Sequence, residues 1–333
     1  MRVHVSYTGG TIGMVDSPQG FVPGADLADW LATLLAGTDL VDELGFTQFD
    51  RLIDSANATP DDWQAIVDDL RANRDSADAF VVLHGTDTMA YTTAALSYAL
   101  TGFGRPVVVT GSQCPLAVVG SDAAGNVTGA VRAATSGRAP GVSLFFGHRL
   151  LAGARAAKVS SWAYAGFDSP NVPPLARVGS PWGWNAAGAD VGRGWANPKP
   201  YARQDVVVAD LCPGISAARL TALLTPTPRA LILRAYGVGN APSEESGLVE
   251  AIARANQAGT VVVVTSQCSQ ADVGLDHYET GAALARIGAI GSSDMTLEAT
   301  YAKVVFLLSQ GLSGPEVAAW MGKSIAGELT ETQ

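Results

Sequence analysis

Residues 79–110 read AFVVLHGTDTMAYTTAALSYALTGFGRPVVVT and predict a strand, a helix and a second strand in succession. The runs 79–83 and 106–110 are short, apolar and bounded by turn residues, as in strands buried on both faces of a sheet. The intervening residues 88–100 have the length and composition of a helix. Because strands joined through a helix pair in parallel, this stretch predicts an α/β fold.

The same alternation continues on both sides of this unit. A helix is expected to begin at Thr59-Pro60-Asp61-Asp62, where an N-cap residue, a first-turn proline and two acidic residues follow one another. The other strands are expected at 3–7, 46–53, 142–146, 206–209, 230–234 and 260–265, and the other helices at 26–36, 122–134, 215–224, 243–258, 278–286, 294–308 and 314–321. This order predicts parallel sheets with helices on both faces.

The chain has 333 residues, which exceeds the size at which one hydrophobic core normally keeps growing. Periodicity is lost over residues 167–203, which are rich in proline, glycine and tryptophan, so this segment is the best linker candidate. We predict a larger, doubly wound, flavodoxin-like or Rossmann-like catalytic domain over 1–190 and a linker over 191–205. A smaller α/β domain with a parallel sheet is expected over 206–333.

The composition excludes several classes of protein. Charged residues make up 16% of the chain, against roughly 25% in typical soluble domains, and the net charge is −10. An acidic chain of this kind is not expected to bind nucleic acid or an anionic membrane. The N-terminus enters a strand directly with no signal-peptide pattern, and the longest apolar runs are strand-sized. The cysteines (Cys114, Cys212, Cys268) are too scattered for a disulfide framework or a metal site, so we expect a cytoplasmic globular protein.

Two polar clusters follow predicted strands, TGGTIG at 8–13 and HGTDT at 84–88. Ligands of open α/β sheets bind beyond the carboxyl ends of the strands, and the free N–H groups of the helix after HGTDT can hold an oxyanion. Lys158 is the only lysine among the first 198 residues and lies in an apolar context. Acyl transfer needs a nucleophile and a base, and these roles could be filled by two threonines, an aspartate and this lysine. Spacing alone leaves open whether they converge.

Several motifs resemble those of the bacterial asparaginases, and above all the cytoplasmic type I L-asparaginases. The similar stretches are TGGTIGM at 8–14, LHGTDTMAYTTAALS at 83–97, VTGSQCPL at 109–116, SPN at 169–171 and RAYGVGNAP at 234–242. The resemblance extends from about Val3 to Leu329 and keeps the same two-domain order. The first two motifs are specific to this family when they occur together.

The resemblance implies an amidohydrolase that converts L-asparagine to L-aspartate and ammonia through a threonyl acyl-enzyme. It implies that Thr11 is the nucleophile and that Thr86, Asp87 and Lys158 form a second catalytic set. It further implies that Asp87 and Thr86 contact the substrate, with Asp87 on its α-ammonium group, and that Ser55 holds its α-carboxylate. Neither a metal nor an organic cofactor is implied.

Phe21 departs from the family pattern, because a tyrosine usually stands ten residues after the nucleophile. The ring of Phe21 can still close over the substrate, but it has no phenol to bond to Thr11. Tyr7 or another hydroxyl can replace that phenol, a water can do so, or the activity is low. These alternatives stay open.

Residues of the second domain are also implied by the resemblance. Asn240 matches a motif that family members present to the active site of a neighbouring subunit, although an asparagine in a left-handed turn would explain it equally. Arg234 and Cys268 fall where some type I enzymes bind asparagine as an effector. Ala157 stands where those enzymes usually have a threonine. A homodimer or a dimer of dimers is the implied assembly.

Two other functions remain to be weighed against an asparaginase. The archaeal amidotransferase subunit that supplies ammonia for glutamyl-tRNA shares the catalytic motifs, but it typically carries an N-terminal extension, and the acidic composition argues against a tRNA partner. A non-catalytic or weakly active amino-acid sensor is supported only by Phe21. The intact set of Thr11, Thr86, Asp87 and Lys158 favours the enzyme.

Overall fold

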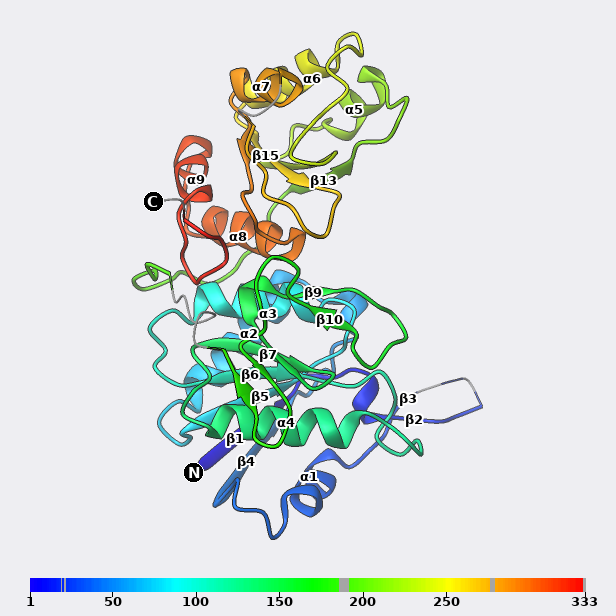
Figure 1. Cartoon of the computed structure of the whole chain (residues 1–333), viewed down its shortest axis with the longest axis vertical. Coiled ribbons are helices and arrows are strands. Elements are labelled where there is room, and N and C mark those ends of the chain that lie inside the picture. Colours follow the sequence, from blue (N-terminus) through cyan, green and yellow to red (C-terminus); the bar gives the residue numbers. More distant parts are fainter. Residues whose placement is uncertain (19, 21, 186–191, 276–278, 332–333) are drawn as a thin grey trace.

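The computed structural model describes residues 1–18, 20, 22–185, 192–275 and 279–331 and consists of two α/β units (Figure 1). The larger unit contains an eight-stranded sheet in the order β12-β11-β8-β7-β6-β5-β1-β4. In chain order its strands are β1 (Arg2–Tyr7), β4 (Glu43–Gln48), β5 (Ala79–Leu83), β6 (Val107–Thr110), β7 (Val142–Phe146), β8 (Arg149–Ala152), β11 (Ala176–Arg177) and β12 (Gly183–Trp184).

Strands β4, β1, β5, β6 and β7 run parallel, which confirms the doubly wound prediction. From β1 the chain first winds outward to β4 and then returns to β5, on the other side of β1. The direction of winding therefore reverses between β1 and β5. A crevice for ligands is expected at that point of such sheets, beyond the carboxyl ends of the strands.

Helices cover both faces of this sheet (Figure 1). One face carries α1 (Leu27–Leu35) and α4 (Ala123–Thr135), and the other carries α2 (Pro60–Ala72) and α3 (Met89–Ala99). Helix α2 begins where the sequence predicts, at a capping box formed by Thr59 and Asp62 with proline in the first turn.

The far edge of the sheet is antiparallel, and here the expectation of purely parallel pairing is wrong. Strand β8 pairs antiparallel with β7, and β11 pairs antiparallel with both β8 and β12. Only Gly147 and His148, both at positive φ, join β7 to β8, which is too short for a parallel crossover. The linker candidate 167–203 also contributes β10 (Phe167–Asp168), β11 and β12.

Two expected elements differ most from their predicted bounds. The strand expected at 46–53 is β4 (Glu43–Gln48), because the chain turns off the sheet after it and Ile53 then bonds to the Thr8 carbonyl. The helix expected at 243–258 is α6 (Leu248–Gln257), which starts only after the left-handed Gly247.

The smaller unit contains a parallel four-stranded sheet, as predicted, in the order β13-β14-β15-β16. Its strands are β13 (Val206–Asp210), β14 (Ala230–Ala235), β15 (Val261–Ser266) and β16 (Ile290–Gly291), and its helices are α5 (Ala217–Leu223), α6, α7 (Glu279–Arg286), α8 (Leu297–Ser309) and α9 (Gly314–Met321). The short elements elsewhere are β2 (Met14–Val15), β3 (Val22–Pro23), β9 (Ala157–Lys158) and the 3₁₀ turns Thr11–Gly13, Ser55–Asn57 and Gly153–Arg155.

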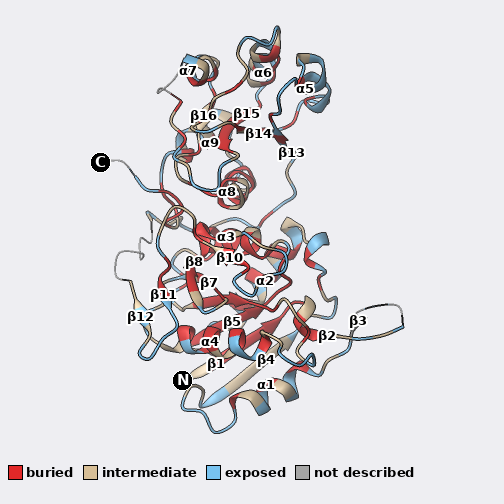
Figure 2. Ribbon diagram, turned by 45° about the vertical axis from the view of Figure 1, so that its right-hand side comes forward, coloured by how far each residue is buried: buried red, intermediate tan, exposed pale blue. Residues whose placement is uncertain are grey.

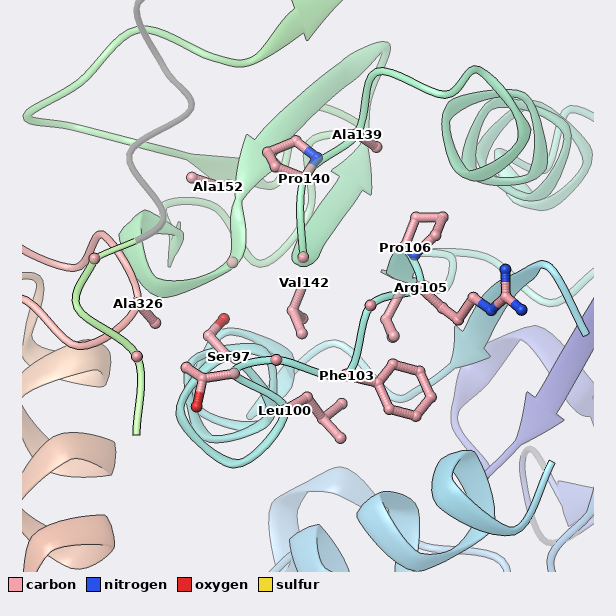
Figure 3. Close-up of a pocket in the computed structure, with 18 of the residues that line it drawn as sticks. Ser97, Leu100, Phe103, Arg105, Pro106, Ala139, Pro140, Val142, Ala152 and Ala326 are labelled. Carbon is pink, nitrogen blue, oxygen red and sulfur yellow. The ribbon is translucent and has the colours of Figure 1, made fainter. Parts of the chain in front are cut away.

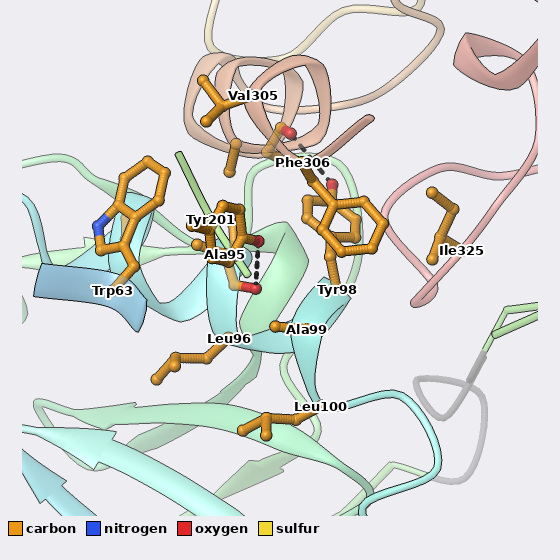
Figure 4. Packing of buried hydrophobic residues seen from close by; sticks show 14 of the residues in the cluster. Trp63, Ala95, Leu96, Tyr98, Ala99, Leu100, Tyr201, Val305, Phe306 and Ile325 are labelled. Atoms are coloured by element: carbon orange, nitrogen blue, oxygen red, sulfur yellow. Dashed lines mark hydrogen bonds between the residues drawn. The ribbon is translucent and has the colours of Figure 1, made fainter. Parts of the chain in front are cut away.

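Helix α8 lies between the two units, and α9 packs beside it along the small sheet (Figures 1 and 2). Residues of both helices belong to one core cluster with residues of α2 and α3. At the contact between α3 and α8, the Tyr98 hydroxyl donates to the Ala299 carbonyl at 3.0 Å (Figure 4). Nearby, the Tyr201 hydroxyl donates to the Ala95 carbonyl at 2.7 Å. Burial raises the pKa of both phenols, which therefore remain neutral donors. Across the described residues, none of the helices has the length and apolarity needed to cross a membrane.

A buried ion pair anchors the C-terminal segment to α8. Lys303 Nζ lies 2.6 Å from Glu328 Oε1, and both side chains are fully buried. The Glu328 carboxylate also accepts the backbone N–H groups of Ile325 and Ala326, at 2.9 and 2.7 Å. We expect Glu328→Ala to lower the free energy of unfolding by about 3 kcal/mol or more, because it leaves a buried ammonium unpaired.

Urea unfolding followed by tryptophan fluorescence measures this loss. Glu331→Ala is the matched control in the same segment, since Glu331 pairs with the exposed Arg193. It is expected to cost about 1 kcal/mol or less. Equal losses for the two variants would contradict a special role for the buried pair.

Candidate active site

Residues 8–13 and 84–88 meet where the winding of the large sheet reverses. The backbone N–H and the hydroxyl of Thr8 both donate to the Leu83 carbonyl, at 3.0 and 2.9 Å. Gly10, at φ 100°, faces Gly85 so closely that a Cβ atom on Gly10 would lie 2.5 Å from the Gly85 Cα. Thr11 follows immediately and opens the turn Thr11–Gly13, so the two predicted motifs lie against each other.

We expect Gly10→Ala to disable this arrangement. The new Cβ would collide with backbone, and the positive φ would add strain, so the free energy of unfolding should fall by about 2 kcal/mol or more. Displacement of Thr11 should lower kcat at least about tenfold for any reaction in which Thr11 takes part. Gly259→Ala is a suitable control, because Gly259 has φ 102° and open space around its Cα. Similar losses in both variants would show that the contact with Gly85 is unimportant.

The structure brings Thr86, Asp87 and Lys158 together. Thr86 is 7% exposed, at the start of the turn that leads into α3. Lys158, on β9, donates from Nζ to Thr86 Oγ1 at 3.0 Å and to Asp87 Oδ1 at 2.8 Å. The amine is thus within proton-transfer distance of a buried hydroxyl, the arrangement that a relay through Thr86 requires.

Ser55 lies beside this set. Its hydroxyl oxygen accepts the backbone N–H of Asp87 at 3.2 Å, and the Thr88 hydroxyl donates to its carbonyl at 2.7 Å. A Cβ on Gly85 would come within 2.5 Å of the Ser55 Oγ, so only glycine fits between them. The polar atoms of Ser55 and Asp87 therefore stand next to each other near Thr86.

The His84 ring contacts both the HGTDT turn and helix α3 through hydrogen bonds. Its Nδ1 lies 2.7 Å from the Gly85 carbonyl and its Nε2 lies 3.1 Å from the Thr92 hydroxyl. The ring is buried, and this burial lowers the pKa of His84, so the imidazole stays neutral at physiological pH. A neutral ring donating from Nδ1 orients the HGTDT turn without adding charge.

Other predicted residues lie apart from this set. Asn240 accepts a hydrogen bond from the Thr280 hydroxyl at 2.8 Å and exchanges backbone bonds with Tyr236, all within the smaller unit. The left-handed residues of that turn are Gly237 and Gly239. Tyr7 packs its phenol against Gly13, where a Cβ would lie 2.1 Å from the hydroxyl. Phe21 lies outside the described residues.

Arg234 and Cys268 line one cavity of about 350 Å³ between the two units. Lys158 and Glu298 line the same cavity. The Arg234 guanidinium pairs with Asp210 at 2.8 Å, while its Nε is buried and has no hydrogen-bond partner among the described residues.

Glu298 is the residue near Lys158 that the sequence did not indicate. It lines the same cavity as Lys158, and burial raises the pKa of its carboxyl group. In sequence, a glutamate in the first turn of a helix indicates only a favourable interaction with the helix dipole. Nothing in the pattern connects it to a lysine so far away along the chain.

A cavity of about 500 Å³ elsewhere in the larger unit contains none of these residues (Figure 3). Pro106, at the start of β6, and Val142, at the start of β7, line it. It therefore lies at the amino ends of the parallel strands, whereas the two motifs lie at the carboxyl ends. In sheets of this type, the carboxyl ends are the ones that bind substrate.

The two motifs and Lys158 thus bring two threonines and an amine to the carboxyl edge of the large sheet, side chains that a hydrolase can use. The family model for the asparaginase N-terminal domain matches residues 2–187, and the model for the glutaminase/asparaginase C-terminal domain matches residues 205–321. The chain belongs to the asparaginase family.

Individual relatives agree with this assignment over the full length. L-asparaginase 1 of Escherichia coli K12 is 42% identical, with 98% of each chain covered. The crystal structure of L-asparaginase I from Vibrio cholerae superposes with a TM-score of 0.89 at 38% identity, covering 99% of both chains. The thermostable L-asparaginase of Thermococcus kodakarensis gives a TM-score of 0.86 at 32% identity, with complete coverage of both.

Proposed function

We propose that this chain is an L-asparaginase, an amidohydrolase that converts L-asparagine to L-aspartate and ammonia through an ester on Thr11. The observation that carries the proposal is the hydrogen-bonded set of Thr86, Asp87 and Lys158 beside the Thr11 turn. Membership of the asparaginase family supports the same reaction.

In the first step, Thr11 Oγ attacks the carbon of the side-chain amide. The carbonyl electrons move onto oxygen, and backbone N–H groups near Thr11 and Thr86 would stabilise that charge. The C–N bond then breaks, and the nitrogen leaves as ammonia with the proton from the threonine hydroxyl. An aspartyl ester on Thr11 remains.

In the second step, water attacks the ester carbon. Thr86 accepts a proton from the water and passes its own proton to Lys158 Nζ, 3.0 Å away, when that amine is neutral. The C–O bond to Thr11 breaks, and the proton held on Lys158 returns through Thr86 to the Thr11 oxygen. L-aspartate leaves, and the site returns to its starting state.

Recognition of the amino-acid part is assigned to Asp87 and Ser55. Asp87 carries the negative charge that an α-ammonium group requires, and its side chain is 61% exposed, so it is open to a ligand. The Ser55 hydroxyl beside it is a donor for the α-carboxylate. The family resemblance adds Phe21 to the residues assigned to substrate binding.

We further propose that the active form is a homodimer or a dimer of dimers in the cytoplasm. Asn240 lies in the smaller unit of this chain, so it would serve the site of a neighbouring subunit. The cavity of Arg234 and Cys268 is proposed as an effector site for asparagine, because the buried Arg234 Nε would gain a partner from a carboxylate.

Ammonia release from L-asparagine, L-glutamine and D-asparagine tests the proposed reaction. We expect release from L-asparagine to exceed release from the other two. A chain that binds L-asparagine but releases no ammonia would instead be a sensor. Release from glutamine alone would point to the ammonia-supplying subunit of an amidotransferase.

A further inference from the structure

The loop between β6 and α4 touches all three segments that carry the proposed catalytic residues. This β6–α4 loop, residues 111–121, leaves the large sheet at the carboxyl end of β6, next to β5. Its first residue, Gly111, lies against the HGTDT turn, since a Cβ on Gly111 would come within 2.3 Å of the His84 carbonyl oxygen. The Leu116 N–H donates to the Ile12 carbonyl at 3.1 Å, inside the TGGTIG motif. Two of the segments therefore rest directly on the loop.

The third segment is the chain just beyond Lys158, and it contacts the side chain of Gln113. The Gln113 amide donates from Nε2 to the carbonyls of Ala163, at 3.0 Å, and Ser160, at 3.4 Å. The same nitrogen lies so close to Gly166 that a Cβ on that glycine would be 2.7 Å away. The chain that follows Lys158 therefore folds around a side chain of the β6–α4 loop.

Asp122 holds the β6–α4 loop in this position. Its carboxylate accepts the backbone N–H of Gln113 through both oxygens, at 2.9 and 3.0 Å, and the backbone N–H of Cys114 at 3.1 Å. The Asn126 side chain donates to the same carboxylate at 3.0 Å and to the Gly111 carbonyl at 2.9 Å. Asp122 and Asn126, which lie one turn apart, thus fasten the loop from Gly111 to Cys114.

Asp122 stands at the position of a helix cap but does not act as one. It is the N-cap residue of α4, yet within the part of the chain that the structure describes its side chain makes no capping hydrogen bond to that helix. An aspartate at an N-cap usually accepts the N–H of the second or third helical residue. Here both oxygens accept from the loop instead, and hydrogen bonds to a charged acceptor are stronger than those between neutral groups. The negative charge of Asp122 therefore acts on the loop.

We propose that Asp122 is a positioning residue for the hydrolytic reaction, because it fixes the loop on which the segments of Thr11, Thr86 and Lys158 all rest. A shift of the loop would move these three groups relative to one another. The proposed proton relay depends on their separation, since Lys158 Nζ must stay within hydrogen-bond distance of Thr86 Oγ1, now 3.0 Å. The kinetic effect of this role rests on the proposed function, whereas its structural effect does not.

Asp122→Ala is expected to lower kcat for L-asparagine by about 10- to 100-fold, because a misplacement of about 1 Å in a catalytic set can cost this much. The KM should stay within about threefold, because Ser55 is held by hydrogen bonds with Asp87 and Thr88 rather than by the loop. Asp122→Asn keeps the size and one acceptor oxygen, but it turns an amide donor toward a backbone N–H. Its kcat should therefore fall between those of wild type and Asp122→Ala.

Glu316→Ala is the matched control, because the Glu316 carboxylate also accepts a backbone N–H, that of Ser313 at 2.8 Å, but at the start of α9 in the smaller unit. It should leave kcat unchanged. A carboxylate that only stabilised the fold would lower the melting temperature of Asp122→Ala and leave kcat of the folded variant at the wild-type value, and that result would overturn the proposal. If Asp122→Ala does not fold, Asp122→Asn takes its place, and an unchanged kcat there would overturn the proposal equally.

A crystal structure of the same Asp122 variant separates this inference from the proposed function. We expect two distances to lengthen beyond hydrogen-bond range: Leu116 N to the Ile12 carbonyl oxygen, from 3.1 Å, and Gln113 Nε2 to the Ala163 carbonyl oxygen, from 3.0 Å. Unchanged distances would refute the positioning role whatever reaction the protein performs. Absence of ammonia release by the wild-type chain, with the distances changed in the variant, would refute only the proposed function.

Discussion

Thr11→Ala is expected to lower kcat for L-asparagine by at least about 10³-fold, with the fold intact. Removal of a nucleophile forces any remaining hydrolysis to proceed by direct attack of water, aided only by binding and oxyanion stabilisation. Thr11 is half-buried at the start of a one-turn 3₁₀ helix. Within the described residues, its side chain makes no hydrogen bond that supports this turn. The loss should therefore appear in kcat rather than in stability.

Steady-state ammonia release, together with a thermal melt of each variant, measures this effect. Thr11→Ser retains a hydroxyl and should keep measurable turnover, whereas Thr38→Ala, on a surface turn, should behave as wild type. Equal turnover by Thr11→Ala and wild type would remove Thr11 from the reaction. It would leave the hydrolase assignment in place and require another nucleophile.

Lys158→Met is expected to lower kcat by about 10³-fold and to trap the ester on Thr11. Methionine keeps the unbranched apolar stem but has no amine to accept the proton relayed by Thr86. The second step depends on this relay, because water is a weak nucleophile unless a base removes its proton. The ester should therefore accumulate when the variant is mixed with L-asparagine.

Mass spectrometry after acid quench tests for this ester, which adds one aspartyl group to the chain. The control is Lys199→Met, because Lys199 Nζ donates to the Gln310 carbonyl, its one hydrogen-bond partner in the part of the chain that the structure describes. Full activity in Lys158→Met would contradict the relay. A large loss without an ester would place Lys158 in the first step instead.

The local elements were largely predictable from sequence. The strands Ala79–Leu83 and Val142–Phe146 and the helix Gly314–Met321 lie within the predicted bounds, because their apolar periodicity and flanking turn residues act over a few residues. The antiparallel edge was not predictable. Strands of two residues carry no periodic signal, and the pairing of Trp182 with Phe145, with ring centroids 5.7 Å apart, is a tertiary contact.

The candidate site likewise has residues that the sequence could place and one residue that it could not. Thr11, Thr86 and Asp87 follow buried strands, so the parallel order of a doubly wound sheet already directs them to one edge. Lys158 stands 72 residues beyond Thr86 and occupies a ribbon outside the main sheet, so spacing could not place it. Family resemblance supplied its role, and only the structure showed the hydrogen bond.

By itself, the sequence determined an α/β chain with two polar clusters at strand ends and one isolated lysine, because hydrophobic period and turn chemistry are local properties. Only the tertiary structure decided that the clusters meet through the Gly10–Gly85 contact and that the Lys158 amine reaches Thr86. The physical reason is distance along the chain: such contacts depend on how β1, β5 and β9 come together in the folded chain, and packing is a property of the assembled core.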